Sequence, residues 1–551
     1  MKKRFAHSIP VLAIGAVTLI IFPLIRCGRY RDNPLQRPIE LAAGFGEIRK
    51  DHFHMGADLR TNGREGLPVY TVKEGYISHI SIQSNGYGKA VWVTHPDGTT
   101  TLYAHLSRFN GAAGKWITAL QYKSQCWQQN LDAPAGSFPV KKGQCIGYSG
   151  NTGTSEGPHL HFEVRNTATG KSLNPLLDVL HVTDTIKPII KAVYWYNRRN
   201  SIYEDSARPV SKSLTRCNTP LIGIGISASD QYAAGRFTTG IDKAWVYKDD
   251  VLQYSFSVQQ LSAENSRYVN ACIDYNKTLH SKRPVQLLFS LPGNRLPYTR
   301  QSTSGGTIDL SDRWQHEIKV VVSDLVGHTT EKKWRMQYDG SASQSNASPA
   351  ERLLYPSRTY LVKSEHAMLQ IPENTFYDAV PLQLIENKSK LTNAVSPAVI
   401  MKMPCAPVHN SFTACIATTL PQGHTLRQRT VMVLSGKKEN MALKGNWKQN
   451  NMLGQFNQTG TIQLVADTIA PVISNPIVEE EKLQFTCTDN LGAIASFTAT
   501  ADGHWLAFDQ KGNCFTYKKD DHFPEDARSL TVTITDIAGN TTVKKYRLQT
   551  R

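Results

Sequence analysis

Three short motifs in the first third of the sequence contain residues whose types and spacing suit metal chemistry. An H-x-x-x-D motif contains His54 and Asp58, a Y-x-H-L motif contains His105, and an H-x-H motif contains His159 and His161. Residues i and i+2 of a strand share one face, so His159 and His161 should point the same way. His54 and Asp58, four residues apart in an extended or turning segment, can also converge on one point. Two imidazoles and one carboxylate are a common ligand set for catalytic zinc, with a fourth position left for water.

Other histidines nearby do not share this pattern. A single histidine is more often hydrogen-bonded or exposed than a ligand, and we interpret His52, His79 and His95 in that way. The three motifs together, in this order and in one segment, are not readily supplied by chance. We predict one zinc ion per chain, because no second group of ligand-type residues stands at usable spacing.

The elements that must position these residues read as strands. Alternating apolar runs cover residues 76–81, 90–94 and 102–105, and they are separated by the turn sequences at 84–86 and 96–98. Long helical periodicity is nearly absent. We therefore predict a mainly β protein.

Composition restricts the class of protein. The chain has 551 residues, which at roughly 100–200 residues per domain predicts three to five domains. Hydrophobic residues make up 40% and charged residues 19%, so wholesale disorder is excluded. Lys plus Arg (62) exceed Asp plus Glu (45) by 17, yet no block of five basic residues occurs. We expect no nucleic-acid partner, and instead a general preference for anionic surfaces or polymers.

The N-terminus predicts export. Lys2, Lys3 and Arg4 precede an apolar run over residues 9–25, and residues 1–27 are interpreted as a signal or membrane-anchor segment in the form of a hydrophobic helix. Three alternatives stay open: an uncleaved anchor, a cleaved signal, and a lipid anchor at Cys27, where Arg26 departs from the usual small residue. Each of them places the rest of the chain in the periplasm or cell envelope, attached to the membrane if the segment is uncleaved.

Cysteine usage agrees with an oxidising compartment. Eight cysteines follow Cys27, and no C-x-x-C motif occurs. They fall in sequential pairs, which predicts disulfides within domains. The expected pairs are Cys126–Cys145, Cys217–Cys272, Cys405–Cys415 and Cys487–Cys514.

A weak internal repeat divides the rest of the chain. Residues 184–190 (DTIKPII) recur as 467–473 (DTIAPVI), and each copy ends in a matching S/T-D-x-x-G signature. A proline-marked first strand and this turn suit a β-sandwich, and both stretches resemble bacterial immunoglobulin-like domains. The predicted domains are a metal-binding domain at 35–180, a sandwich with an insertion at 184–340, a β-rich domain at 350–466, and an immunoglobulin-like sandwich at 467–551.

The three motifs resemble those of the lysostaphin-type (LytM-like) zinc peptidases, which cut peptide cross-links of bacterial peptidoglycan. The resemblance covers about residues 40–178 and includes the glycine-rich segment 143–153. It implies a small antiparallel sheet with a groove, zinc ligands at His54, Asp58 and His161, and catalytic histidines at His105 and His159. The glycines would permit tight turns and close approach by an extended substrate. The stretch 110–139 departs from the family and is expected to add a groove wall.

Three functions remain open at this point. The first is an exported zinc endopeptidase acting on peptidoglycan, the second a non-catalytic envelope adaptor that regulates another hydrolase, and the third an adhesin or scaffold whose sandwiches bind envelope proteins. No H-E-x-x-H or G-x-S-x-G motif occurs, so proton transfer and oxyanion stabilisation would fall to the two catalytic histidines. A fragment of about residues 35–180 is expected to carry the catalysis, with the sandwiches positioning it.

Overall fold

The computed structural model describes residues 33–548, except 181, 183, 211–213, 232–237, 282–283, 298, 302–303, 342–351, 437–439 and 480. The predicted N-terminal segment 1–27 lies outside these residues. Strands dominate the described residues, so the mainly β class is confirmed. No helix within them has the length and apolar character needed to cross a bilayer.

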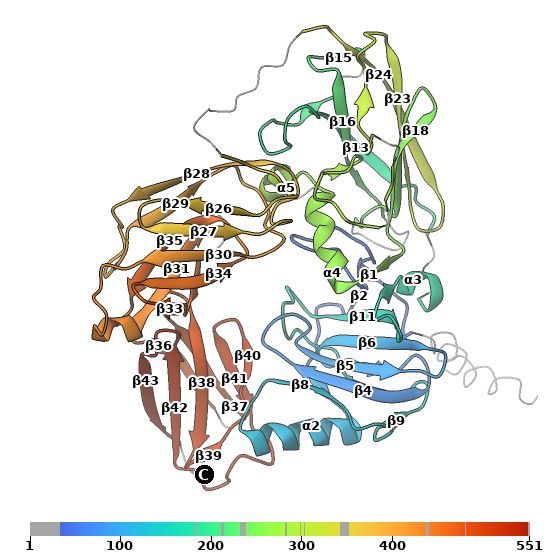
Figure 1. Ribbon diagram of the computed structural model, residues 1–551. Helices are drawn as coiled ribbons and strands as arrows, with labels where there is room; N and C mark the ends of the chain where they lie inside the picture. Colours follow the sequence, from blue (N-terminus) through green and yellow to red (C-terminus); the bar gives the residue numbers. More distant parts are fainter. Residues whose placement is uncertain are drawn as a thin grey trace, which may run out of the picture.

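The N-terminal region (residues 33–180) is built on one large antiparallel sheet and one small one (Figure 1). The main path of the large sheet is β1 (Leu41–Ala43), β2 (Ala57–Arg60), β11 (His159–Asn166), β6 (Thr99–Leu106), β5 (Lys89–Thr94), β4 (Gly75–Ile82) and β8 (Gln129–Asp132). β12 (Ser172–Leu173) and β9 (Pro139–Val140) pair with β11 and β4, and β19 (Gln260–Leu261), from further along the chain, pairs with β12. The small sheet contains β3 (Pro68–Tyr70), β10 (Cys145–Tyr148) and β7 (Arg108–Phe109), and the short helix α3 (Pro175–Asp178) ends the region.

The stretch 110–139 forms a helix, α2 (Gly111–Ser124), followed by β8 and β9. Its buried residues, Ala113, Ile117 and Gln121, recur every four positions and so lie along one face. The last turn of the helix lies beside the C-terminal sandwich (Figure 1), where Tyr122 contacts Tyr517 and His522. The stretch therefore contacts another domain, a role that the sequence did not predict, and the groove wall stays a prediction.

Three pairs of facing sheets follow, and we name them by position. The first sandwich (residues 184–341) contains β14 (Arg208–Pro209), β13 (Ile189–Asn197), β16 (Leu221–Ser229), β20 (Gln286–Leu287) and β22 (Ile308–Asp309) in one sheet. Its other sheet contains β15 (Leu214–Cys217), β24 (Thr329–Tyr338), β23 (His316–Ser323), β17 (Lys243–Lys248), β18 (Val251–Ser257) and β21 (Thr299–Gln301). The insertion that lengthens this copy carries α4 (Ala263–Ser266), the 3-10 helix η1 (Arg267–Ala271) and α5 (Tyr275–His280).

The middle sandwich (residues 352–466) also has two sheets. One contains β25 (Arg352–Leu354), β28 (Val380–Asn387), β29 (Ala398–Lys402), β35 (Gly460–Ala466), β31 (Thr430–Gly436) and β32 (Asn440–Leu443). The other contains β26 (Tyr360–Lys363), β27 (Ala367–Ile371), β30 (Phe412–Ala417), β34 (Asn451–Phe456) and β33 (Asn446–Lys448), with the 3-10 helix η2 (Thr425–Arg429) before β31.

The C-terminal sandwich (residues 467–548) is the smallest. Its sheets are β36 (Val472–Val478), β37 (Lys482–Thr488), β41 (Cys514–Lys518) and β40 (Asp509–Lys511), and β39 (His504–Trp505), β38 (Ile494–Ala501), β42 (Ser529–Asp536) and β43 (Thr541–Arg547). Buried and partly buried residues alternate along β42, as expected for a strand covered on one face.

The cores show how the parts are joined. One continuous apolar cluster runs through the first and middle sandwiches and includes Phe53 and Met55 of the N-terminal region. The C-terminal sandwich has a core of its own. It lies against α2, so the four parts close into a ring (Figure 1).

The eight described cysteines are unpaired, so the expected disulfides are wrong for this structure. Cys487 and Cys514 show one reason. Thr486 stands opposite Cys514, and Cys487, the next residue along β37, faces the buried side while Cys514 lies on the other face. Sequence order paired these residues, but strand alternation separates them.

Candidate metal centre

Strand β11 brings the three motifs together because it lies between β2 and β6. Asp58 of β2 stands directly opposite His161, and Ala104 of β6 stands opposite it on the other side. Gly56 allows this close packing, because a Cβ at that position would lie 2.4 Å from the Phe162 carbonyl oxygen. His105 follows Ala104 near the end of β6, where its left-handed φ of 59° interrupts the strand alternation that would otherwise point it to the opposite face.

Three ligand-type atoms converge at this point. His54 Nε2 lies 3.0 Å from Asp58 Oδ1 and 3.0 Å from His161 Nδ1, and His161 Nδ1 lies 2.9 Å from Asp58 Oδ1. Ligands of a tetrahedral zinc ion with bonds of 2.0–2.1 Å stand roughly 3.3 Å apart. The spacing of the three atoms therefore fits one small ion.

The hydrogen bonds on the far side of each ring decide which atoms carry lone pairs. His54 Nδ1 donates to the Gly44 carbonyl oxygen at 2.7 Å, and His161 Nε2 donates to Glu163 Oε1 at 2.9 Å. In the neutral rings, His54 Nε2 and His161 Nδ1 are then left with lone pairs that face the Asp58 carboxylate. Three acceptors this close need a positive charge between them, and a carbonyl or carboxylate behind each histidine is the usual support of a metal ligand.

The pKa shifts point to the same demand for positive charge. Burial lowers the pKa of His161, but hydrogen bonds with Asp58 and Glu163 outweigh burial and raise that pKa to about 9. Burial would raise the pKa of Asp58, yet His54 and the neighbouring histidines hold it well below its ordinary value. The second oxygen of Asp58 accepts a hydrogen bond from Arg49 Nη2 at 2.7 Å. The carboxylate is thus kept ionised and oriented.

Glu163 supports the site from a fully buried position that the sequence analysis assigned no role. Besides His161, its carboxylate accepts hydrogen bonds from Tyr87 (2.6 Å), Arg165 (2.8 Å) and Ser172 (2.9 Å). Burial raises its pKa, but Arg165 and His161 more than compensate and lower it. The signal was present: in H-x-H-x-E the glutamate shares the face of both histidines. Arg49 and the Gly44 carbonyl carried no comparable signal.

His105 and His159 flank the three convergent atoms. Their ring centroids are 4.8 Å apart, and His159 Nε2 lies 3.5 Å from Asp58 Oδ1. His105 Nδ1 donates to the Thr152 carbonyl oxygen and His159 Nδ1 to that of Gly157, so each neutral ring presents Nε2 as a proton acceptor. Burial, followed by the charges of His161 and His159, lowers the pKa of His105 to about 3, which leaves it neutral near pH 7.

The glycine-rich segment shapes the rim beside His105. A Cβ at Gly150 would lie 2.4 Å from the Ser107 backbone nitrogen, and one at Gly153 would lie 2.4 Å from that of Gly88. His105 itself has a φ of 59°, in the left-handed region. The close approach that we expected for a substrate is in fact made by the chain's own backbone, which fixes the loop that holds His105.

The remaining histidines of this region have ordinary partners, as expected. His95 bonds the Glu74 carbonyl oxygen and Thr101, His79 bonds Asp132 and Asn130, and His52 bonds Asp51. None of the three joins the convergent group.

Comparison with known proteins identifies the family of the region that carries these residues. Residues 52–122 and 133–175 match peptidase family M23. The chain contains an M23 peptidase domain. The residues between the two matched segments, 123–132, fall at the end of α2 and in β8, within the departure noted from the sequence.

The similarity to curated relatives is confined to this peptidase domain. The chain is 35% identical over 123 residues to the DD-carboxypeptidase/endopeptidase Mpg of Neisseria meningitidis, which is 22% of this chain and 22% of that protein. It is 32% identical over 111 residues to lysostaphin of Staphylococcus simulans, covering 20% of this chain and 17% of lysostaphin. The solved catalytic domain of the latter is 27% identical and covers 25% of this chain and 90% of that chain, but the TM-score of 0.19 supports no inference about fold. The chain thus spans about a fifth of the curated relatives it matches.

Proposed function

We propose that the chain is an exported zinc metalloendopeptidase that hydrolyses peptide cross-links of bacterial peptidoglycan. The observation that carries this proposal is the convergence of His54 Nε2, Asp58 Oδ1 and His161 Nδ1 on one point, with His105 and His159 beside it. Each of the three atoms faces inward because the opposite side of its residue is held by a separate partner.

The chemistry follows from these residues. Zinc held by His54, Asp58 and His161 would polarise a scissile carbonyl and lower the pKa of a bound water towards 7. His105 is held through Nδ1 by the Thr152 carbonyl oxygen, so its Nε2 is the atom that can accept a proton from the attacking water during the reaction. The ring of His159 lies 4.8 Å from that of His105, centroid to centroid. His159 can therefore share proton transfer or stabilise the developing oxyanion.

The substrate class rests on the relatives and on charge. Relatives of the peptidase domain are named as a DD-carboxypeptidase/endopeptidase and as a glycyl-glycine endopeptidase. Peptidoglycan is peptide-like and anionic, and this chain has a net charge of +17. The same reasoning supports an extracytoplasmic location, with contacts to envelope proteins through the sandwiches.

The test uses residues 28–551 and purified wall sacculi. We expect about one zinc per chain, and release of cross-linked peptides with intact glycan strands. His54→Ala, Asp58→Ala and His161→Ala should lose most of the zinc, because each change removes a ligand. His105→Ala and His159→Ala should retain zinc and lose hydrolysis by at least about 100-fold.

His79→Ala is the matched control, since His79 lies in the same sheet with ordinary polar partners. It should retain both zinc and activity. Full zinc content in all three ligand variants would refute the metal site. A zinc-loaded chain that is inert on every wall type would favour the adaptor function instead.

A further inference from the structure

Each of the two repeat-related sandwiches has a cluster of aspartates at the end where the chain enters it. In the C-terminal sandwich, Asp467 precedes β36, Asp489 directly follows β37, and Asp536 is the last residue of β42. One oxygen from each aspartate lies within 4.8 Å of the others. The three residues come from three separate segments, so sequence spacing did not reveal them.

The first sandwich repeats this arrangement at equivalent positions. Asp184 stands before β13 as Asp467 stands before β36, and Asp230 and Asp324 directly follow β16 and β23. Asp184, Asp324 and His328 offer ligand atoms within 4.8 Å of one another. The charges of both aspartates act on Asp230, which therefore lies close by. The repeat seen in the sequence thus extends to an acidic cluster.

Buried carboxylate oxygens without a partner point to a missing ligand. Asp467 is only 2% exposed; its Oδ1 accepts from the backbone nitrogen of Ile469 and from Asn490, but its Oδ2 has no partner. Asp489 Oδ1 is likewise buried and without a partner. An unsatisfied buried carboxylate oxygen is costly.

The equivalent atoms of the first sandwich also lack partners. They are Oδ2 of Asp184, which corresponds to Asp467 and is 9% exposed, and Oδ1 of Asp230, which corresponds to Asp489 and is 3% exposed. Among the described residues, no Lys or Arg forms an ion pair with any aspartate of either cluster. Two sites with the same unsatisfied atoms are difficult to attribute to an accident of packing.

We propose that each of these sandwiches binds one divalent, oxygen-preferring cation, for which Ca²⁺ is the probe. The ligands are Asp467, Asp489 and Asp536 in the C-terminal sandwich, and Asp184, Asp230 and Asp324 in the first. Carboxylate oxygens are the ligands that calcium prefers, and at bonds of 2.3–2.6 Å those on opposite sides stand roughly 4.6–5.2 Å apart. The oxygens of Asp467, Asp489 and Asp536, and those of Asp184 and Asp324, lie close enough together to share such an ion.

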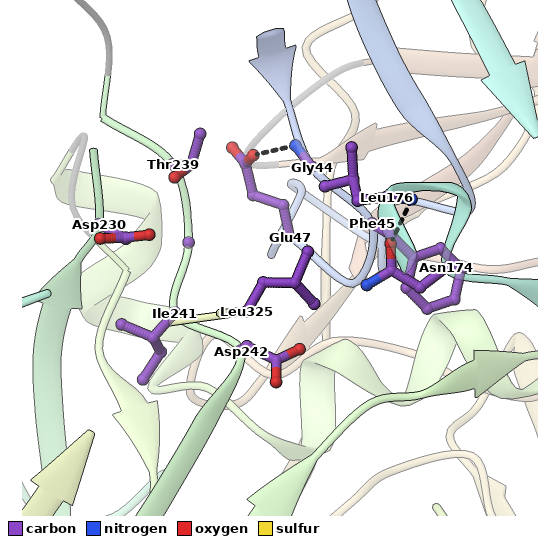
Figure 2. Close-up of a pocket in the computed structure, with 11 residues that line it drawn as sticks. Gly44, Phe45, Glu47, Asn174, Leu176, Asp230, Thr239, Ile241, Asp242 and Leu325 are labelled. Atoms are coloured by element: carbon purple, nitrogen blue, oxygen red, sulfur yellow. Dashed lines mark hydrogen bonds between the residues drawn. The ribbon is translucent and has the colours of Figure 1, made fainter. Parts of the chain in front are cut away.

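The cation of the first sandwich lies at its junction with the peptidase domain. Asp230 and Asp242 of the sandwich and Glu47 of the peptidase domain line one small pocket (Figure 2). The pocket offers about 20 Å³ to the centre of a water-sized sphere, which is room for one water molecule. Gly44, whose carbonyl supports His54, is on its wall.

The cation of the C-terminal sandwich lies at its junction with the middle sandwich. The Asp467 backbone nitrogen donates to the Arg429 carbonyl oxygen, and Arg429 Nη1 donates to that of Ala538. Each cation ties together three segments at a domain junction, and so holds the orientation of successive domains.

Equilibrium dialysis of the zinc-loaded full chain against radioactive Ca²⁺ tests the proposal, independently of any hydrolysis. We expect two Ca²⁺ per chain and a rise in Tm on adding Ca²⁺. Asp467→Asn/Asp489→Asn and Asp184→Asn/Asp230→Asn should each bind one, and the combined variant none. Asn keeps the shape of Asp, and circular dichroism would establish that each variant is folded.

Asp521→Asn, a change of an exposed carboxylate in the C-terminal sandwich, is the matched control and should retain both ions. Absence of Ca²⁺ binding by the unsubstituted chain at millimolar concentration would overturn the proposal. So would an unchanged stoichiometry in either double variant, because the bound calcium would then lie elsewhere.

Discussion

The peptidase domain meets the rest of the chain on two sides, and the two contacts differ in kind. Towards the first sandwich, the contact is apolar and buried. Phe53 is fully buried with its ring 6.0 Å from that of Phe256, and Met55 joins the same core. Two backbone interactions add to this contact. Strand β12 pairs with β19, and the Phe53 backbone nitrogen donates a hydrogen bond to the Ser266 carbonyl oxygen.

Towards the C-terminal sandwich, the contact is polar and partly exposed. Asp509 accepts hydrogen bonds from Lys89 at 2.8 Å and from Trp127 at 2.9 Å. Lys511 donates a hydrogen bond to the Asn151 carbonyl oxygen. The next residue, Thr152, is the one whose carbonyl oxygen accepts from His105. Tyr122 of α2 stacks on His522 with ring centroids 3.7 Å apart.

The difference assigns separate roles to the two contacts. Phe53 and Met55 flank His54, so the apolar contact holds this proposed metal ligand in place through buried surface. The polar contact touches the rim of the site and contributes less energy, because exposed ion pairs are worth little. The closed arrangement of the four domains should therefore open first at the contact between the peptidase domain and the C-terminal sandwich.

The largest effect is expected for Phe53→Ala. Loss of a fully buried phenylalanine costs about 3–5 kcal/mol of stability, and here it also loosens the backbone of His54, so zinc affinity should fall. Denaturant unfolding and zinc competition would measure the two effects. Phe485→Ala, in the separate core of the C-terminal sandwich, is the control and should lose comparable stability while zinc affinity stays unchanged. Equal zinc loss in both variants would break the comparison.

Truncation extends the same test. A chain ending at residue 466 should keep its zinc affinity, whereas the fragment 35–180 exposes Phe53 and Met55 and should bind zinc more weakly. The sequence led us to expect that this fragment would be sufficient. The structure indicates that the fragment lacks the surface against which Phe53 and Met55, on either side of the proposed ligand His54, are packed.

The sequence predicted what depends on local spacing. Strand alternation places His159 and His161 on one face, and the same rule could have included Glu163, which follows by two. Local spacing could not predict that Phe53 packs into another domain, or that Arg49 and the Gly44 carbonyl reach the site. Those contacts depend on how distant segments pack in the folded chain. Helix α2 was missed because its apolar face is narrow, with Gln121 among its buried residues.

A smaller effect concerns pH and the continuous core. His409 of the middle sandwich packs on Tyr268 of the first and hydrogen-bonds Tyr377. Burial, then the charges of Arg267 and Arg295, lower the pKa of His409 to about 4. The unfolded chain takes up this proton near pH 6.5, so stability should be present above that pH and lost as pH falls from about 6.5 to 4.

His409→Gln should flatten this part of the stability curve, measured as Tm against pH. Because the ring is partly exposed, we expect a difference of only about 1 kcal/mol between the two ends of the window. His504→Gln, at an exposed histidine of the C-terminal sandwich, is the control and should leave the curve unchanged. A curve for His409→Gln identical to that of the unsubstituted chain would assign the acid sensitivity to other groups.

The smallest effect is expected for Asp509→Ala, which removes the acceptor that Lys89 and Trp127 share at the polar contact. The Asp509 side chain is 47% exposed, so the stability loss should be about 1 kcal/mol or less. None of the five site residues contacts Asp509 in the described hydrogen bonds and ion pairs, so hydrolysis of a short soluble cross-link peptide should stay within about twofold. Asp521→Ala, an exposed carboxylate of the same sandwich, controls for loss of charge. A tenfold or greater loss on the short peptide with zinc retained would show that the C-terminal sandwich holds the His105 loop in its active position. The polar contact would then act on catalysis through Lys511 and Asn151, and the division of roles between the two sides would fail.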